Sequence, residues 1–274
     1  MNGRRPFFLF TMLAFGYAFL YVPIISLIVY SFNASRLVTV WGGFSTRWYS
    51  ELLNNDQILA AAWLSLRIAA MNASVSVVLG TFAGLALSHF GRFRGRTLFS
   101  AMVSAPLVMP DVILGLASLL LFVSMGDLLG WPQGRGVTTI TIAHITFSLA
   151  YVTVIVHSRL SQMDESIEEA ALDLGARPWK VFLVITLPII SPALVAGWLL
   201  AFTLSLDDLV ISSFVSGPGA TTLPMVVYSS VRLGVSPQIN ALATIIVALV
   251  TAGIVVTGFV MHRSDQRNHA NGAP

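Results

Sequence analysis

The sequence predicts an all-α, polytopic membrane protein with six transmembrane helices and both termini on the cytoplasmic side. Of the 274 residues, 56% are hydrophobic and only 10% are charged, whereas soluble domains carry about 25% charged residues. The mean hydropathy is +0.82, and a disordered chain would instead combine low hydrophobicity with high charge. These observations exclude both a soluble domain and a disordered chain.

Charged residues divide the chain into long apolar stretches, and a helix of about 20 apolar residues spans a bilayer. We expect spans at approximately residues 7–31, 65–89, 98–124, 138–157, 181–205 and 238–262, within a single transmembrane domain covering residues 1–274. The first stretch follows Arg4 and Arg5, but it exceeds the apolar core of about 7–15 residues typical of a signal peptide. It is therefore predicted to be the first span.

A seventh neutral stretch, residues 209–231, is interrupted by Gly217, Pro218, Gly219 and Pro224. Irregular backbone is not tolerated where it faces lipid, so we expect a folded segment at the membrane surface or packed against other helices.

The distribution of basic residues supports six spans, because cytoplasmic loops are enriched in Lys and Arg. Six spans place four arginines outside and ten basic residues inside. The outer residues are Arg36, Arg47, Arg135 and Arg232, and the inner residues are Arg4, Arg5, Arg92, Arg94, Arg96, Arg159, Arg177, Lys180, Arg263 and Arg267. A seventh span would move the C-terminal arginines outside.

No catalytic or metal site is predicted. The sequence has no cysteine, and it lacks the G-x-x-x-x-G-K-[ST], H-E-x-x-H and G-x-S-x-G motifs. The five histidines are scattered, and we interpret them, including His144 and His157 in the fourth span, as structural residues. The chain is therefore not expected to be an enzyme.

The loop between the fourth and fifth spans, residues 158–180, is strongly acidic. Its acidic residues are Asp164, Glu165, Glu168, Glu169 and Asp173, and its apolar residues recur with helical spacing at Ile167, Ala170, Ala171 and Leu174. Gly175 fits a left-handed helix end, and Pro178 fits the start of a second helix. Membrane-surface helices are usually basic, so this helix–turn–helix is predicted to dock on a protein partner.

The same loop resembles the EAA signature of bacterial ABC-importer permeases. Glu169-Ala170-Ala171 is followed by Gly175 and then by Ile185-x-Leu187-Pro188 with the spacing of that signature. The resemblance implies the type I ABC importer permease fold and a multi-pass protein of the bacterial inner membrane. It also implies that the loop contacts a separate ATPase subunit, through Glu168, Glu169, Ala170, Ala171, Asp173, Leu174, Gly175 and Arg177.

Three further segments are similar to polyamine permeases, first to that of a putrescine importer and next to that of a spermidine/putrescine importer. They are YSFNASRLVTVWGGFSTRWY, APLVMPDVILGL and the region from FTLSLDDLVISSFVSGPGATTLP to INALAT. The resemblance implies a heteromeric complex with a second, non-identical permease, two ATPase subunits and an extracytoplasmic polyamine-binding protein. ATP and Mg would be held by the ATPase, and this chain would bind no cofactor.

Carboxylates in or near the spans are candidates for a dication pathway. Asp111 lies directly after Pro110, near the middle of the third predicted span, where an ionised side chain should face a cavity or a partner. The structural alternative is a proline-kinked helix whose Asp111 pairs with a neighbour such as Arg67 or with a second subunit. Asp207 and Asp208 follow the fifth span, and Ser205-x-x-Asp208 also matches a capping box, which is the structural alternative. Asn72 fits helix packing as well as a pathway, and Phe214 and Tyr228 are candidates for stacking on an amine.

Three other interpretations of function stay open at this point. The permease could serve spermidine or another small solute instead of putrescine. A secondary transporter or channel subunit would work without ATP, and it offers no explanation for the acidic loop. A membrane scaffold without a transport role offers no reason for Asp111 within a span.

Overall fold

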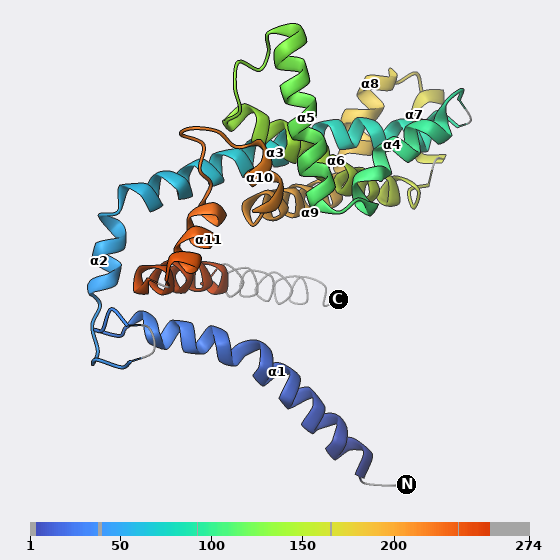
Figure 1. The fold of residues 1–274 in the computed structure, drawn as a ribbon. Helices are drawn as coiled ribbons and strands as arrows, with labels where there is room; N and C mark the ends of the chain where they lie inside the picture. Colours follow the sequence, from blue (N-terminus) through green and yellow to red (C-terminus); the bar gives the residue numbers. More distant parts are fainter. Residues whose placement is uncertain (1–3, 38–39, 92, 165, 235, 253–274) are drawn as a thin grey trace. The chain divides into compact units, whose positions relative to one another are not determined.

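The structure is a computed structural model that describes residues 4–37, 40–91, 93–164, 166–234 and 236–252. In the described residues it is helical apart from turns and one isolated bridge between Asn33 and Phe44. The chain divides into two compact units, Met1–Leu59 with Val227–Pro274, and Ala60–Val226. The elements can be followed by colour in Figure 1.

The first unit contains α1 (Arg4–Ser31), α2 (Arg47–Leu53) and the helix Pro237–Ala252, together with parts of α3 (Asp56–His89) and α11 (Leu223–Leu233). The loop after α1 is organised by Asn33, whose side chain accepts from Gly42 N–H at 2.8 Å and donates to the Val40 carbonyl at 2.8 Å. Trp48 of α2 is buried and donates its indole N–H to the carbonyl of Asn33. This loop is therefore a folded structure rather than a simple connection.

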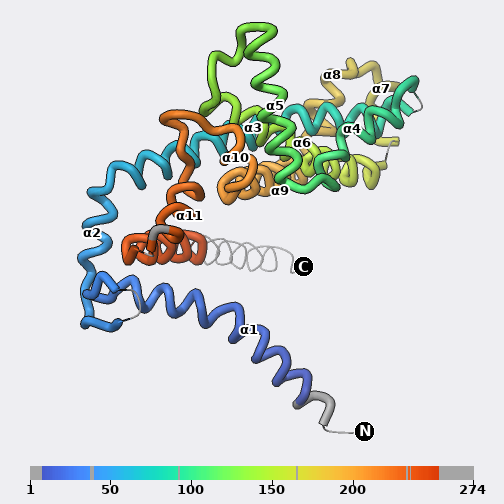
Figure 2. The backbone as a smooth tube through the Cα atoms, in the orientation of Figure 1, coloured from blue at the N-terminus to red at the C-terminus, as the bar shows by residue number. Residues whose placement is uncertain are grey.

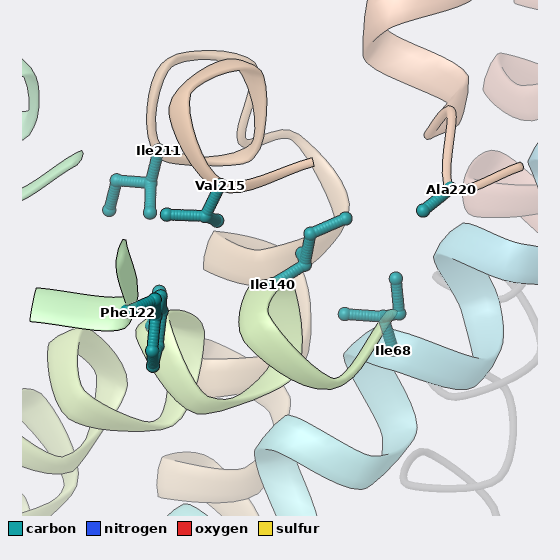
Figure 3. Close-up of a cluster of buried hydrophobic side chains, with 7 residues drawn as sticks. Ile68, Phe122, Ile140, Ile211, Val215 and Ala220 are labelled. Carbon is teal, nitrogen blue, oxygen red and sulfur yellow. The ribbon is translucent and has the colours of Figure 1, made fainter. Parts of the chain in front are cut away.

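The second unit is built around α6 (Val137–Leu160), which packs against α4 (Arg96–Val108), α5 (Asp111–Leu129), α9 (Leu187–Leu206) and α10 (Val210–Val215). Some hydroxyls of α6 bond within the helix, as in Thr141 to Val137 O and Thr153 to Leu149 O. Side chains such as Val152 and Val156 are fully buried between the helices. Figure 3 shows a second apolar cluster of this unit, in which Ile140 lies near Ile211 and Val215 of α10.

Five helices of the described chain are long and apolar enough to cross a membrane: Phe8–Ser31, Asp56–His89, Asp111–Leu129, Val137–Leu160 and Pro178–Leu206. Two further apolar helices, Arg96–Val108 and Pro237–Ala252, are shorter. The second predicted span begins earlier than expected, because α3 has 34 residues, or about 50 Å of helix. The end of the sixth predicted span lies outside the described residues. Six spans and the orientation of the termini stay predictions.

The third predicted span, residues 98–124, is divided into two helices rather than continuous. Helix α4 ends at Val108, Met109 is extended with ψ 135°, and Pro110 precedes α5 with ψ 141°. A residue before proline is driven out of the helical region by the proline ring, and proline has no N–H for the helix ladder. Asp111 is therefore the first residue of a new helix, and not a residue inside a kinked one. The break can be traced in Figure 2.

The seventh neutral stretch is folded and packed against other helices, as one of the two predicted arrangements requires. It forms the short helix α10, whose Ile211 and Val215 are buried against α5 and α6, and then a turn leading to α11. The acidic loop forms α7 (Ser166–Asp173) and α8 (Pro178–Val181), as predicted. A π-helical turn, η1 (Phe182–Thr186), joins α8 to α9.

Candidate functional site

The structure brings Asp111, Asp207 and Asp208 into one neighbourhood of the Ala60–Val226 unit. Asp208, Asp111 and His144 all lie within electrostatic range of the Asp207 carboxylate. Asp111 begins α5 and Asp207 directly follows α9, and both residues are exposed in this chain. The helix N-terminus favours a negative charge at Asp111. Two accessible carboxylates from distant parts of the sequence therefore lie near each other.

Asp208 differs from these two residues because its carboxylate is fully engaged. It accepts hydrogen bonds from the backbone N–H groups of Ile211 at 3.1 Å and Ser212 at 2.7 Å, so it caps the start of α10. Its Oδ2 lies 3.1 Å from Nε2 of His144, which is 2% exposed. Asp208 therefore anchors α10 and has little capacity left for a solute.

His144 joins three elements, which fits its interpretation as a structural residue, but the sequence did not indicate its partners. Its Nδ1 lies 2.7 Å from Ser205 Oγ on α9, and its Nε2 lies 3.1 Å from Ser212 Oγ on α10. The predicted capping box of Ser205 with Asp208 is wrong, because Ser205 lies inside α9 and contacts His144 instead. The available signal was a histidine in the middle of an apolar span, since a buried imidazole needs polar partners.

The other three pathway candidates occupy different surroundings. Asn72 is fully buried in a packed network, where it donates to Ser148 Oγ at 3.0 Å and to the Ala201 carbonyl at 2.8 Å. This is a helix-packing role and not a position on an open surface. Phe214 packs against the apolar cluster of α5, α6 and α10. Tyr228, on α11, lies under the guanidinium of Arg232, with 5.6 Å between the guanidinium carbon and the ring centroid.

The acidic loop has the capped helix that its sequence predicts. Gly175 has a φ of +83°, Ala176 N–H donates to Ala171 O at 3.1 Å, and Gly175 N–H donates to Leu172 O at 2.8 Å. These are the two bonds of a Schellman motif. At the other end, hydrogen bonds from the side chain and backbone of Ser166 hold the pKa of the Asp164 carboxyl below its ordinary value. Both ends of α7 are thus fixed locally.

Helix α7 presents its apolar side outward, and none of its residues is buried. Ile167 is 45% exposed and Leu174 is 89% exposed. The predicted partner-contacting residues that are exposed are Glu169, Ala170, Asp173, Leu174, Gly175 and Arg177, and Ala171 is half-buried. Glu168 is the exception, because its carboxylate turns inward to His89 Nε2 at 2.9 Å and to the hydroxyl of Thr186.

No group of three or more histidine or carboxylate side chains in the described part of the chain is arranged to hold a metal ion.

Comparison with known proteins identifies relatives along nearly the whole chain. This chain is 59% identical to the putrescine transport system permease protein PotI of Escherichia coli (strain K12), over 93% of its own length and 91% of that protein. It is 43% identical to the spermidine/putrescine transport system permease protein PotC of the same strain, over 92% of this chain and 93% of that protein.

Solved structures share the fold at low sequence identity. A chain of a bacterial ABC transporter that imports the acidic polysaccharide alginate superposes with a TM-score of 0.71 at 19% identity, covering 96% of this chain and 98% of that one. A chain of the MetNI methionine ABC transporter superposes with a TM-score of 0.60 at 16% identity, covering 76% of this chain and 95% of that one. The predicted all-α fold of ABC importer permeases is thereby confirmed. Residues 76–269 match the binding-protein-dependent transport system inner membrane component family, and the chain belongs to this family of multi-pass inner-membrane proteins.

Proposed function

We propose that this chain is the permease subunit of an ATP-driven ABC importer of polyamines, with putrescine as the first substrate. The observation that carries the proposal is the 59% identity to a putrescine permease over 93% of the chain. A relative named for spermidine and putrescine follows at 43% identity. Spermidine, which also carries several amines, is the second candidate substrate.

The exposed carboxylates of Asp111 and Asp207, which lie within electrostatic range of each other, support a cationic substrate. A carboxylate at the bilayer centre costs about 2.5–3.5 kcal/mol, so it is retained where it faces a cavity or a partner. The backbone break before Asp111 favours the same location, because irregular backbone at membrane depth must be covered by protein or line a cavity. A diamine passing between Asp111 and Asp207 offsets the repulsion between these side chains. Asp208 and Asn72 have structural roles and are not proposed as part of this route.

The pathway would be completed by a second, non-identical permease subunit. Val108 and Met109 at the break are 83% and 42% exposed, and such an edge needs a protein cover in the membrane. On the cytoplasmic side, two ATPase subunits would carry ATP and Mg, and one would bind the exposed face of α7. A binding protein would deliver the substrate from outside. Closure of the ATPase dimer would then switch the helices between outward and inward access.

Replacing PotI in E. coli with this chain tests the proposal. In cells that lack PotI, this chain should restore the uptake of radiolabelled putrescine, and uptake should stop when the ATPase of that system is inactivated. Uptake that continues without the ATPase would support a secondary transporter or channel instead. Competition with unlabelled spermidine distinguishes the two substrates, since a putrescine permease complex should keep most of its putrescine uptake at equal concentrations.

A further inference from the structure

Glu168 occupies an unusual position for an acidic residue of a docking helix. Its side chain is only 15% exposed, while Glu169 beside it is exposed. Glu168 and Leu172 lie one helical turn apart, and both line a cavity beside α7, although Leu172 is also 44% exposed. The apolar residues Ile167 and Leu174 occupy the outer side. The two glutamates of this loop therefore have different partners and need separate functional explanations.

The Glu168 carboxylate connects α7 to two other elements of the Ala60–Val226 unit. One oxygen lies 2.9 Å from Nε2 of His89, the last residue of α3, and the other accepts the hydroxyl proton of Thr186, the last residue of η1. In the described part of the chain, these are the hydrogen bonds that side chains of α7 make to other elements. Charge-assisted hydrogen bonds of this kind are about twice as strong as neutral ones.

The surroundings of this carboxylate leave room for movement. A cavity of about 370 Å³ lies under α7, lined by His89, Glu168 and Thr186 and by apolar side chains of α3, α7, α8 and η1. No residue of α7 is buried, so this helix is not held by a packed core. A displaced α7 is therefore guided by the Glu168 bonds together with its contacts to α8 and η1.

Both partners of Glu168 are placed to pass a displacement on to the membrane helices. Thr186 is 2% exposed and ends a π-helical turn at the start of the fifth predicted span. Such turns interrupt the regular ladder and occur frequently at functional sites. The end of α3 is itself tied to α4, because Arg96 donates to the Leu87 carbonyl at 2.9 Å. Helix α4 leads directly to the break before Asp111.

We propose that Glu168 is a positioning residue that transmits the displacement of the docking helix α7 to α3 and to the π-helical turn before α9. This inference rests on the proposed function, because it presupposes that an ATPase moves α7. It assigns to Glu168 a role inside the permease, whereas Glu169 and the exposed apolar residues of α7 contact the ATPase.

The test uses the complete importer with its ATPase and binding protein, and it measures radiolabelled putrescine imported per ATP hydrolysed. Glu168→Ala and Thr186→Val should each lower this ratio by about tenfold, which corresponds to about 1.4 kcal/mol, while the ATPase still co-purifies in normal amount. Thr186→Ser keeps the hydroxyl and should retain the wild-type ratio. The double variant should be no worse than either single variant, because both remove the same link.

A matched control is Ser161→Ala, which removes a hydroxyl bonded to the His157 carbonyl at 2.8 Å at the start of the same loop and leaves Glu168 untouched. It should keep the wild-type ratio. The inference is overturned if Thr186→Val and Thr186→Ser behave alike, or if Glu168→Ala loses the ATPase, which would make Glu168 a docking residue. A wild-type complex that imports no putrescine with ATP would instead contradict the proposed function itself.

Discussion

At the scale of single residues, Asp207 and Asp208 are adjacent and chemically identical, but their surroundings differ. Asp208 is bonded to His144 and to the backbone of α10, whereas Asp207 is exposed and lies within electrostatic range of Asp111. We therefore propose a structural role for Asp208 and a solute contact for Asp207.

Neutralising Asp208 should lower the stability of the protein, whereas neutralising Asp207 should lower transport. Asp208→Asn places an amide against N–H donors, and we expect a loss of about 1–3 kcal/mol of stability, the cost of unsatisfied buried groups. Thermal unfolding of the purified chain in detergent measures this loss. Asp207→Asn should leave unfolding unchanged and reduce putrescine uptake in the complete importer. Equal unfolding temperatures for the two variants would contradict this assignment.

Asn72 provides a second prediction at this scale. Its amide bridges α3 to Ser148 of α6 and to Ala201 of α9. Asn72→Leu should lower the stability by about 1–2 kcal/mol, the upper range for interhelical hydrogen bonds in membranes, while uptake per folded molecule stays normal. Thr203→Val is the control, since the Thr203 hydroxyl bonds only within its own helix in the described structure. If the Asn72→Leu protein is stable but does not transport, Asn72 has a role in the pathway after all.

At the scale of elements, helix α7 depends on the left-handed residue that ends it. Gly175 has a φ of +83° with nothing within 4 Å of an added Cβ, so only backbone strain opposes substitution. A left-handed non-glycine residue costs about 1–2 kcal/mol. Gly175→Val should loosen the end of α7 and weaken the coupling of ATP hydrolysis to uptake. Gly134→Ala is the control, because Gly134 also has free space but its φ is not in the left-handed region, and it should behave as wild type. Normal coupling in Gly175→Val would contradict a role for this helix cap.

Helix packing against Val152 offers a paired test. A Cβ on Gly80 of α3 would lie 2.7 Å from Val152 Cγ1, whereas a Cβ on Gly197 of α9 would lie 3.4 Å from the same atom. Gly80→Ala should therefore cost about 1–3 kcal/mol through overpacking. Gly197→Ala makes an ordinary contact and should be neutral, or stabilising through the better helix propensity of alanine. Thermal unfolding compares the two directly, and a larger loss for Gly197→Ala would refute the packing described.

At the scale of the whole molecule, six spans with both termini inside is a prediction that cysteine labelling can test. The chain contains no cysteine, so single cysteines report without background. Gln133 and Gln162 are both exposed, and they lie in loops predicted on opposite sides. In intact spheroplasts, an impermeant maleimide should label Gln133→Cys, while Gln162→Cys and Asn268→Cys should react only after permeabilisation. Labelling of Asn268→Cys from outside would indicate an odd number of spans.

The sequence by itself determined the helical class, the approximate positions of the long apolar helices and the helix–turn–helix whose first helix ends at Gly175. These features depend on local apolar length and on local backbone preferences, which a linear sequence contains. Pro110 also indicated a distortion of the helix near Asp111, but the sequence did not show that one helix ends there and another begins.

Only the tertiary structure decided which polar side chains are engaged in hydrogen bonds with other parts of the fold. Asp208 with His144, Asn72 with Ser148, and Glu168 with Thr186 are pairs that join separate helices. A hydrogen bond between helices depends on how far each helix is rotated and shifted against its neighbour, and hydropathy along one segment does not contain that information. For this reason the acidic residues could be located from the sequence, but their division into anchors, links and candidate solute contacts required the fold.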